Sequence, residues 1–171
     1  MTIMNNQPVS FENSICPVPL TKHENIMLGH GSGGGMTHDL IKNIFQPHFS
    51  NPALNAGNDF AELLNLQNGR IVVSTDAHIV SPLFFPGGDI GRLAVCGTVN
   101  DISMSGGIPL AITASFIIEE GFAIKDLERI VRSMAKAASE AGISIVAGDT
   151  KVVEKGKADG VFISTSGIAV G

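Results

Sequence analysis

Four aspartates stand at positions where an acidic side chain is unusual. Asp59 follows NAGN, Asp76 ends the β-branched run IVVST, Asp149 follows SIVAG, and Asp101 comes after Asn100 in a mostly apolar stretch. A single aspartate at a strand end is most often a turn or capping residue. Asp101 fits that explanation least, because a carboxylate on an apolar helix needs a partner charge or a cation. If the four converge, their mutual repulsion favours a bound divalent cation, and oxygen ligands without histidine or cysteine suit Mg²⁺ that bridges to phosphate.

The stretch LGHGSGGGMTHDLI at positions 28–41 offers the second half of such a site. Backbone amides in a glycine-rich loop can surround a phosphate group, although a flexible linker or a simple helix-entry turn would also use glycines. Gly29, Gly31 and Gly34 match the dinucleotide-binding pattern, but the acid that this motif requires about 20 residues later is replaced by the loop NPALN. Gly35 is followed by Met36 and not by lysine, which excludes a Walker A loop, and the motifs of protein kinases are absent.

The elements that must position these residues follow from the hydrophobic periodicity. We expect an apolar strand at 26–28, a helix over 36–45 that Pro47 ends, and a hairpin with strands near 60–66 and 71–79 joined by a turn at 68–69. Next come a buried helix over 90–99, a strand over 108–121, an amphipathic helix over 125–142, and strands over 143–149 and 160–171. This order predicts an α+β protein, in which helices pack on one sheet.

Composition excludes several classes of protein. The formal net charge is −5 without a lysine or arginine cluster, which argues against nucleic acid and anionic membranes as partners. No apolar run approaches the roughly 20 residues that span a bilayer, and residues 1–25 have the composition of a flexible lead-in without a signal peptide. Cys16 and Cys96 form no metal-binding pattern, so we expect a reducing, cytoplasmic location.

The motifs together resemble the superfamily of aminoimidazole ribonucleotide synthetase, selenophosphate synthetase and thiamine-monophosphate kinase. Within it they are most similar to the HypE family of hydrogenase maturation factors. The resemblance rests on LGHGSGGGMTHDLI, STDAHIVSPLFFPGGDIGRLAVCGTVNDISMSGGIP, FIIEEG and AGISIVAGDTKVV. It covers residues 26–171 and corresponds to the N-terminal, ATP-binding domain of that family. The family's C-terminal domain and its cysteine-bearing tail are absent from this chain, so we expect it to be inactive alone.

The resemblance implies a function and partners. HypE-type proteins use ATP to dehydrate a thiocarboxamide on their own C-terminal cysteine to a thiocyanate, which supplies the cyanide ligand of iron in [NiFe]-hydrogenase. The carbamoyl group comes from the carbamoyltransferase HypF, and the acceptor is the HypC–HypD scaffold complex. N-terminal domains of the superfamily have a mixed sheet packed on helices. They pair into a homodimer through a shared β-barrel, and the nucleotide lies near that interface.

The resemblance also assigns roles to individual residues. Asp59, Asp76, Asp101 and Asp149 are the expected ligands of the Mg²⁺ that accompanies the triphosphate. Asn100, Thr150 and Lys151 are expected near the phosphates, with Asp149 and Lys151 as the catalytic pair. Gly31, Gly33, Gly34 and Gly35 would form a mobile flap over the triphosphate, with Ser32 or His30 as side-chain contacts.

Other positions keep two interpretations. For His78 a packed or solvated histidine is favoured over a general acid or base. Glu119 and Glu120 fit metal or water partners and a solvated strand end equally well. Two other functions also remain open. One is a small-molecule kinase or selenophosphate-synthetase-like enzyme, which the glycine loop disfavours because it lacks a reactive cysteine. The other is a non-catalytic dimerisation and docking module.

Overall fold

A four-stranded sheet organises the described part of the protein. The computed structural model describes residues 24–55 and 70–171. The strands are β1 (Ile71–His78), β4 (Ile108–Glu119), β5 (Ser144–Val153) and β6 (Val161–Val170), in the order β1-β6-β4-β5. β6 is antiparallel to both of its neighbours, whereas β4 and β5 are parallel. The predicted mixed sheet is therefore confirmed.

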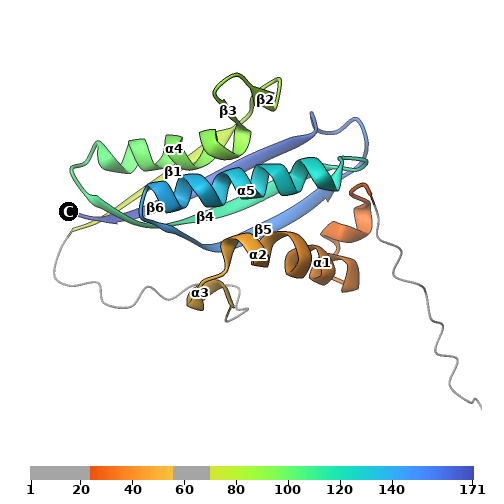
Figure 1. The fold of residues 1–171 in the computed structure, drawn as a ribbon, viewed down its shortest axis with the longest axis horizontal. Helices are drawn as coiled ribbons and strands as arrows, with labels where there is room; N and C mark the ends of the chain where they lie inside the picture. The colour runs from red at the N-terminus through yellow and green to blue at the C-terminus, as the bar shows by residue number, and fades with distance from the viewer. Residues whose placement is uncertain (1–23, 56–69) are drawn as a thin grey trace, which may run out of the picture.

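Two long helices cover one face of this sheet (Figure 1). α4 (Ile90–Ser103) begins at Asp89, whose Oδ1 accepts a hydrogen bond from the Arg92 amide at 3.0 Å and so caps the helix. α5 (Ile124–Glu140) ends before Gly142, which has a φ of +70° and lets the chain turn back into β5. Alternate residues of the strands and one stripe of each helix fill the core between the layers, among them Ile112, Phe116, Leu127, Ile130, Met134 and Ile163.

The motif PLFFPGGDIG forms a small hairpin above the start of α4 (Figure 1). Its strands are β2 (Phe84–Phe85) and β3 (Gly88–Asp89), and Gly87 supplies the positive φ that the turn requires. The Arg129 guanidinium on α5 stacks on the Phe84 ring, 3.9 Å from its centroid, and attaches the hairpin to the helix layer.

A series of short helical segments runs beside β5, the edge strand (Figure 1). These are η1 (Leu28–Gly31), α1 (Gly35–Leu40), η2 (Ile41–Phe45), α2 (Gln46–Phe49) and α3 (Pro52–Asn55). Two predictions were wrong here. Residues 26–28 form no strand. The backbone of the buried Ile26 hydrogen-bonds to Phe122 and Gly121, and the chain then enters η1 at Leu28. Pro47 does not end the helix, since η2 is a wider π-turn that leaves room for a proline ring one turn later.

Of the predicted hairpin, only the second strand can be assessed. β1 matches the expected strand over 71–79, and its partner in the sheet is β6. The strand near 60–66 and the turn at 68–69 lie outside the described residues. The other predicted elements are confirmed with shifted ends. α4 continues to Ser103 and β5 to Val153, whereas β4, α5 and β6 end one or two residues earlier than predicted.

The second face of the sheet is covered by neither α4 nor α5, and it exposes several apolar side chains among serines and threonines. On β1 the exposed residues include Ile71 and Val73, and on β4 they include Ile108 and Ile117. Val73 is 66% exposed and Ile108 is 72% exposed. An apolar patch of this kind on a sheet face is typical of an interaction surface. Among the described residues, no helix is long and apolar enough to cross a membrane.

Candidate functional site

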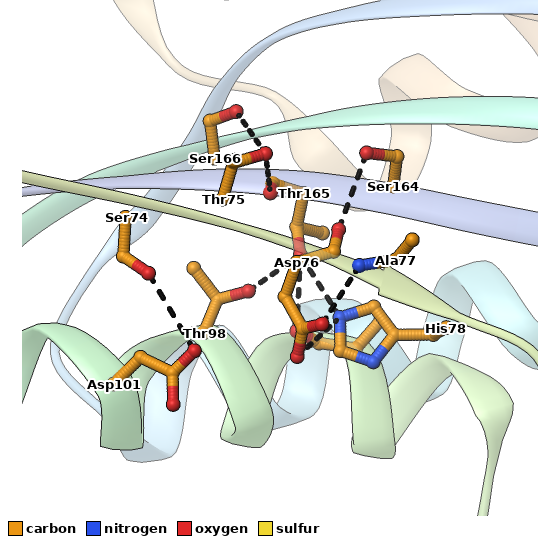
Figure 2. Close-up of polar contacts among 11 residues, drawn as sticks. Ser74, Thr75, Asp76, Ala77, His78, Thr98, Asp101, Ser164, Thr165 and Ser166 are labelled. Atoms are coloured by element: carbon orange, nitrogen blue, oxygen red, sulfur yellow. Dashed lines mark hydrogen bonds and ion pairs between the residues drawn. The ribbon is translucent and has the colours of Figure 1, made fainter.

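Asp76 and Asp101 lie on facing elements at the β1 edge of the sheet (Figure 2). Asp76 projects from β1 toward α4, and its Oδ1 accepts a hydrogen bond from the Ala77 amide at 2.8 Å. Asp101 lies on the last turns of α4, and its Oδ2 accepts a bond from the Ser74 hydroxyl at 3.5 Å. Figure 2 shows both carboxylates in the space between the strand and the helix.

The donor chemistry of this cluster fits a hard cation. The Asp76 side chain is 40% exposed, so oxygen lone pairs remain open to solvent. Within the described part of the chain, neither Asp76 nor Asp101 forms an ion pair with lysine or arginine. Two carboxylates and a hydroxyl are ligands that Mg²⁺ prefers. Asp101 itself is exposed, so the argument that helix burial forces it to have a partner was wrong.

His78 lies next to Asp76 and is only 4% exposed. Its Nε2 is 3.6 Å from Asp76 Oδ2 and 3.1 Å from Thr165 Oγ1. Burial lowers the pKa of His78 below its ordinary value of 6.5, against the opposing pull of Asp76 and Asp101. The imidazole is therefore neutral near pH 7 and leaves the negative charge of both carboxylates in place. The packed-histidine interpretation is confirmed.

Asp149 and Lys151 form a second cluster on β5. Lys151 Nζ lies 3.1 Å from Asp149 Oδ1, and the two side chains are 65% and 57% exposed. Asp149 pairs with Ser115 in the sheet, and both are exposed, so Asp149 and Lys151 project from the face that the long helices leave open. Asp76 pairs with the buried Thr165 and projects from the helix-covered face.

The predicted acids therefore do not meet in one place within the described chain. β1 and β5 are the two edges of the sheet, so Asp76 and Asp149 lie on opposite edges and opposite faces. No group of three or more histidine, cysteine, aspartate or glutamate side chains within residues 24–55 and 70–171 is arranged to hold a metal ion. Asp59 lies outside the described residues. The structure thus separates a carboxylate cluster from an Asp149–Lys151 cluster.

A cavity of about 480 Å³ opens beside the second cluster. Its polar rim includes Gly31, Gly33, Thr150 and Lys151, and apolar side chains from β4, β5 and the short helices form its wall. Thr150 lies between Asp149 and Lys151 in β5, so its side chain points to the opposite, helix-covered side of the sheet, where it is half-buried. The glycine loop and the Thr150–Lys151 pair therefore border the same cavity, as expected for phosphate contacts. Asn100 is instead exposed on α4, beside Asp101.

The glycines of the loop have different structural roles. A Cβ on Gly31 would lie 2.5 Å from the Val152 amide nitrogen, so Gly31 is required for packing on β5. Gly33 has a φ of +80° and donates its N–H to Thr37 Oγ1 at 2.9 Å. A Cβ on Gly35 would meet nothing within 4 Å, and one on Gly34 would meet only the Ser32 hydroxyl, at 3.7 Å. The fold therefore accounts for Gly31 and Gly33, whereas it does not require Gly34 and Gly35.

Three polar residues outside the predicted site are also structured. Thr98 and Thr165 are buried and share a hydrogen bond between their hydroxyls, next to His78 (Figure 2). The alternation of inward and outward side chains along β6 is the only sequence signal that could have shown that Thr165 is buried. Glu119 is the last residue of β4, and its carboxylate accepts hydrogen bonds from the Gly156 and Gly160 amides.

Comparison with protein families identifies the fold. Residues 58–171 match the model of the AIR synthase related protein, N-terminal domain. The chain belongs to this family. The family match includes the strands and helices that carry both clusters, so the resemblance recognised from the motifs is confirmed at the level of the fold.

Relatives within this family are similar in sequence as well. The chain is 57% identical over 149 residues to carbamoyl dehydratase HypE of Cupriavidus necator, and the match covers 87% of this chain and 42% of that protein. It is 53% identical to a HypE crystallised in complex with ATP, with a TM-score of 0.81 over 84% of this chain and 42% of that one. A chain in the crystal structure of a HypE–HypF complex is 60% identical to this chain. The match has a TM-score of 0.59 and covers 77% of this chain and 42% of that chain. The chain thus spans less than half the length of these relatives.

Proposed function

We propose that residues 26–171 are the ATP-binding domain of a HypE-type carbamoyl dehydratase that acts in hydrogenase maturation. The observation that carries the proposal is the similarity to the HypE solved with ATP, at 53% identity over 84% of this chain. The glycine loop, Thr150 and Lys151 around one cavity, and the carboxylates of Asp76 and Asp101, are the groups that such a domain needs. A cytoplasmic location is part of the same proposal.

The proposed reaction converts a cysteine-bound thiocarboxamide and ATP into a thiocyanate, ADP and phosphate. The amide oxygen attacks the γ-phosphorus and ADP leaves, after which loss of phosphate and two protons from nitrogen leaves the carbon–nitrogen triple bond. Asp76, Asp101 and Asp149, with Asp59, would hold Mg²⁺, which neutralises charge on the triphosphate when bound. Lys151 would offset charge on the γ-phosphate, while the amides of Gly31–Gly35 and the side chains of Thr150 and Asn100 position the phosphates.

Pairing with a second copy is the second part of the proposal. The uncovered sheet face exposes several apolar side chains and carries Asp149 and Lys151 at its β5 edge. A shared β-barrel that buries this face would place β5 of one protomer close to β1 of its partner. Such a pairing would bring the edge strand that carries Asp149 and Lys151 in one chain next to the edge strand that carries Asp76 in the other.

The partners follow from the same similarity. One of the similar structures is a complex of HypE with HypF, which supports HypF as the donor of the carbamoyl group. We propose the HypC–HypD complex as the acceptor of the cyano group. The segment that carries the reacting cysteine corresponds to the part of the relatives that this chain does not span.

Calorimetric titration of the 171-residue chain with Mg-ATP tests the proposal. Asp101→Asn and Asp149→Asn each remove one charge from an exposed side chain, so the fold is expected to persist while affinity falls at least roughly tenfold. Glu154→Gln removes an exposed acid outside both clusters and serves as the control. Unchanged affinity in both aspartate variants would refute the assignment of the site, and absence of Mg-ATP binding by the unmodified chain would refute the ATP-binding role.

A further inference from the structure

His78 connects three elements at the carboxylate cluster. Its ring is buried between β1, β6 and α4, and its Nε2 faces both Thr165 Oγ1 at 3.1 Å and Asp76 Oδ2 at 3.6 Å (Figure 2). Thr165 in turn bonds to the Thr98 hydroxyl on α4. Asp101 lies three residues after Thr98 on the same helix face. One histidine therefore contacts the first carboxylate and, through Thr165, the helix that carries the second.

The threonine hydroxyls and the imidazole form one buried network. The Thr165 hydroxyl lies 3.4 Å from the Ala94 carbonyl, and it also hydrogen-bonds to Thr98 Oγ1 and His78 Nε2. His78 Nε2 therefore lies between a hydroxyl to which it is hydrogen-bonded and the Asp76 carboxylate, in polar contact with both.

Gly97 makes the space for this arrangement. A Cβ at position 97 of α4 would lie 3.0 Å from His78 Cε1 and 3.3 Å from Asp76 Oδ2. Contacts of this length are tighter than side chains normally make, so a methyl group at position 97 would displace the imidazole and the carboxylate from their present positions on the helix. Two independent features, the threonine network and the glycine surface, hold His78 and Asp76 in one position relative to α4.

We propose that His78 is a positioning residue that holds the Asp76 carboxylate at the spacing from Asp101 that a divalent cation requires. The inference rests on the proposed function, because it assumes that Asp76 and Asp101 bind the cation that accompanies ATP. Groups that orient metal ligands in this way commonly change metal affinity by about 10–100-fold when they are removed. The role concerns affinity for the cation and leaves affinity for the nucleoside unchanged.

The test measures ATP binding by calorimetry at a series of Mg²⁺ concentrations, with thermal unfolding recorded for each variant. His78→Phe keeps a flat ring but removes the ring nitrogens, and is expected to raise the half-saturating Mg²⁺ concentration about tenfold or more. Binding should be restored at excess Mg²⁺. His78→Gln keeps an N–H donor and should remain within about threefold of the unmodified chain. Ile163→Val trims a buried side chain on β6 outside the polar network and controls for loss of packing.

Each outcome decides the inference. An unchanged Mg²⁺ dependence in His78→Phe overturns it, as does an equal shift in Ile163→Val or a failure of His78→Gln to restore affinity. If His78→Phe does not fold, Thr165→Val removes the hydroxyl that hydrogen-bonds to His78 Nε2 and should shift the Mg²⁺ dependence in the same direction, and no shift overturns the inference. If the unmodified chain shows no Mg²⁺-dependent ATP binding, the proposed function fails with it. Normal Mg-ATP binding with no effect of His78 defeats the positioning role alone.

Discussion

A single carboxylate, Glu119, fixes the loop that joins β5 to β6. It lies at the end of β4 and accepts hydrogen bonds from the Gly156 and Gly160 amides, two glycines with positive φ. These bonds, foremost the one from Gly156, hold the pKa of Glu119 below its ordinary value of 4.5. The ionised carboxylate thus substitutes for a regular turn, and the fold of this loop is linked to the charge on one residue.

The consequence is a pH-dependent loop. Because the folded-state pKa is lowered, the stabilisation from Glu119 is present above pH 4.5 and is lost as the pH falls through the lower folded value. Hydrogen exchange at the Gly156 and Gly160 amides should therefore be slow near neutral pH. Glu119→Gln should speed it, because a neutral amide accepts these bonds less strongly. Equal protection in the variant and the unmodified chain at pH 7 would contradict this role.

Individual site residues were predictable only where their type was unusual for its place. Asp76, Asp101 and Asp149 could be singled out because acids interrupt apolar runs. Their relative positions could not, since whether two strands become neighbours or opposite edges depends on pairing between distant segments. Thr98 gave no signal, and Thr165 gave only the inward alternation of β6, because a buried threonine is unremarkable until the partner of its hydroxyl is known.

The glycine loop between η1 and α1 contains two kinds of glycine. Some are required by the fold, and others leave space that a ligand could use. Gly31 packs against β5, whereas Gly35 lies at the first position of α1 with open space where a side chain would be. Such a division cannot be read from the spacing of the glycines, because it depends on how closely β5 approaches the loop. The same holds for η2, where the π-turn that accommodates Pro47 has no sequence signature.

Two alanine variants distinguish these roles. Gly31→Ala should lower the free energy of unfolding by about 1–3 kcal/mol, because its methyl group would collide with the Val152 backbone. Gly35→Ala should leave stability unchanged or raise it by up to about 1 kcal/mol, since alanine favours the helix. It should nevertheless weaken Mg-ATP binding if the loop closes on the triphosphate. Urea denaturation and calorimetry measure both quantities, and a Gly35→Ala chain with full affinity would exclude close approach of the phosphates.

At the scale of the whole molecule, the open sheet face is the most conspicuous surface. One face is packed under α4 and α5, while the other leaves Ile71 and Val73 exposed on β1. The sequence predicted the sheet and the two long helices, because period-2 and period-3.6 patterns are local. It could not reveal which face stays open, since both faces carry apolar residues.

A charged substitution on that face tests the proposed pairing. Val73→Glu changes a side chain that is 66% exposed in one chain, so the fold should persist while burial of the new charge disfavours a dimer. Sedimentation velocity should then report a dimer for the unmodified chain and a monomer for the variant. Leu93→Glu, on the exposed side of α4, is the matched control and should remain dimeric. The same mass for all three chains would refute pairing through this face.

The position of β6 also has a consequence for how the protein comes to be folded. β6 follows every other strand of the sheet along the chain, yet it lies between β1 and β4 and hydrogen-bonds to both. Among the described strands, β1 therefore has no partner until β6 emerges from the ribosome, and β4 pairs only with β5. We therefore expect the sheet to assemble late and slowly, as is usual when distant segments must meet. During synthesis two unpaired strand edges are exposed to aggregation, which a chaperone that shields nascent chains would reduce.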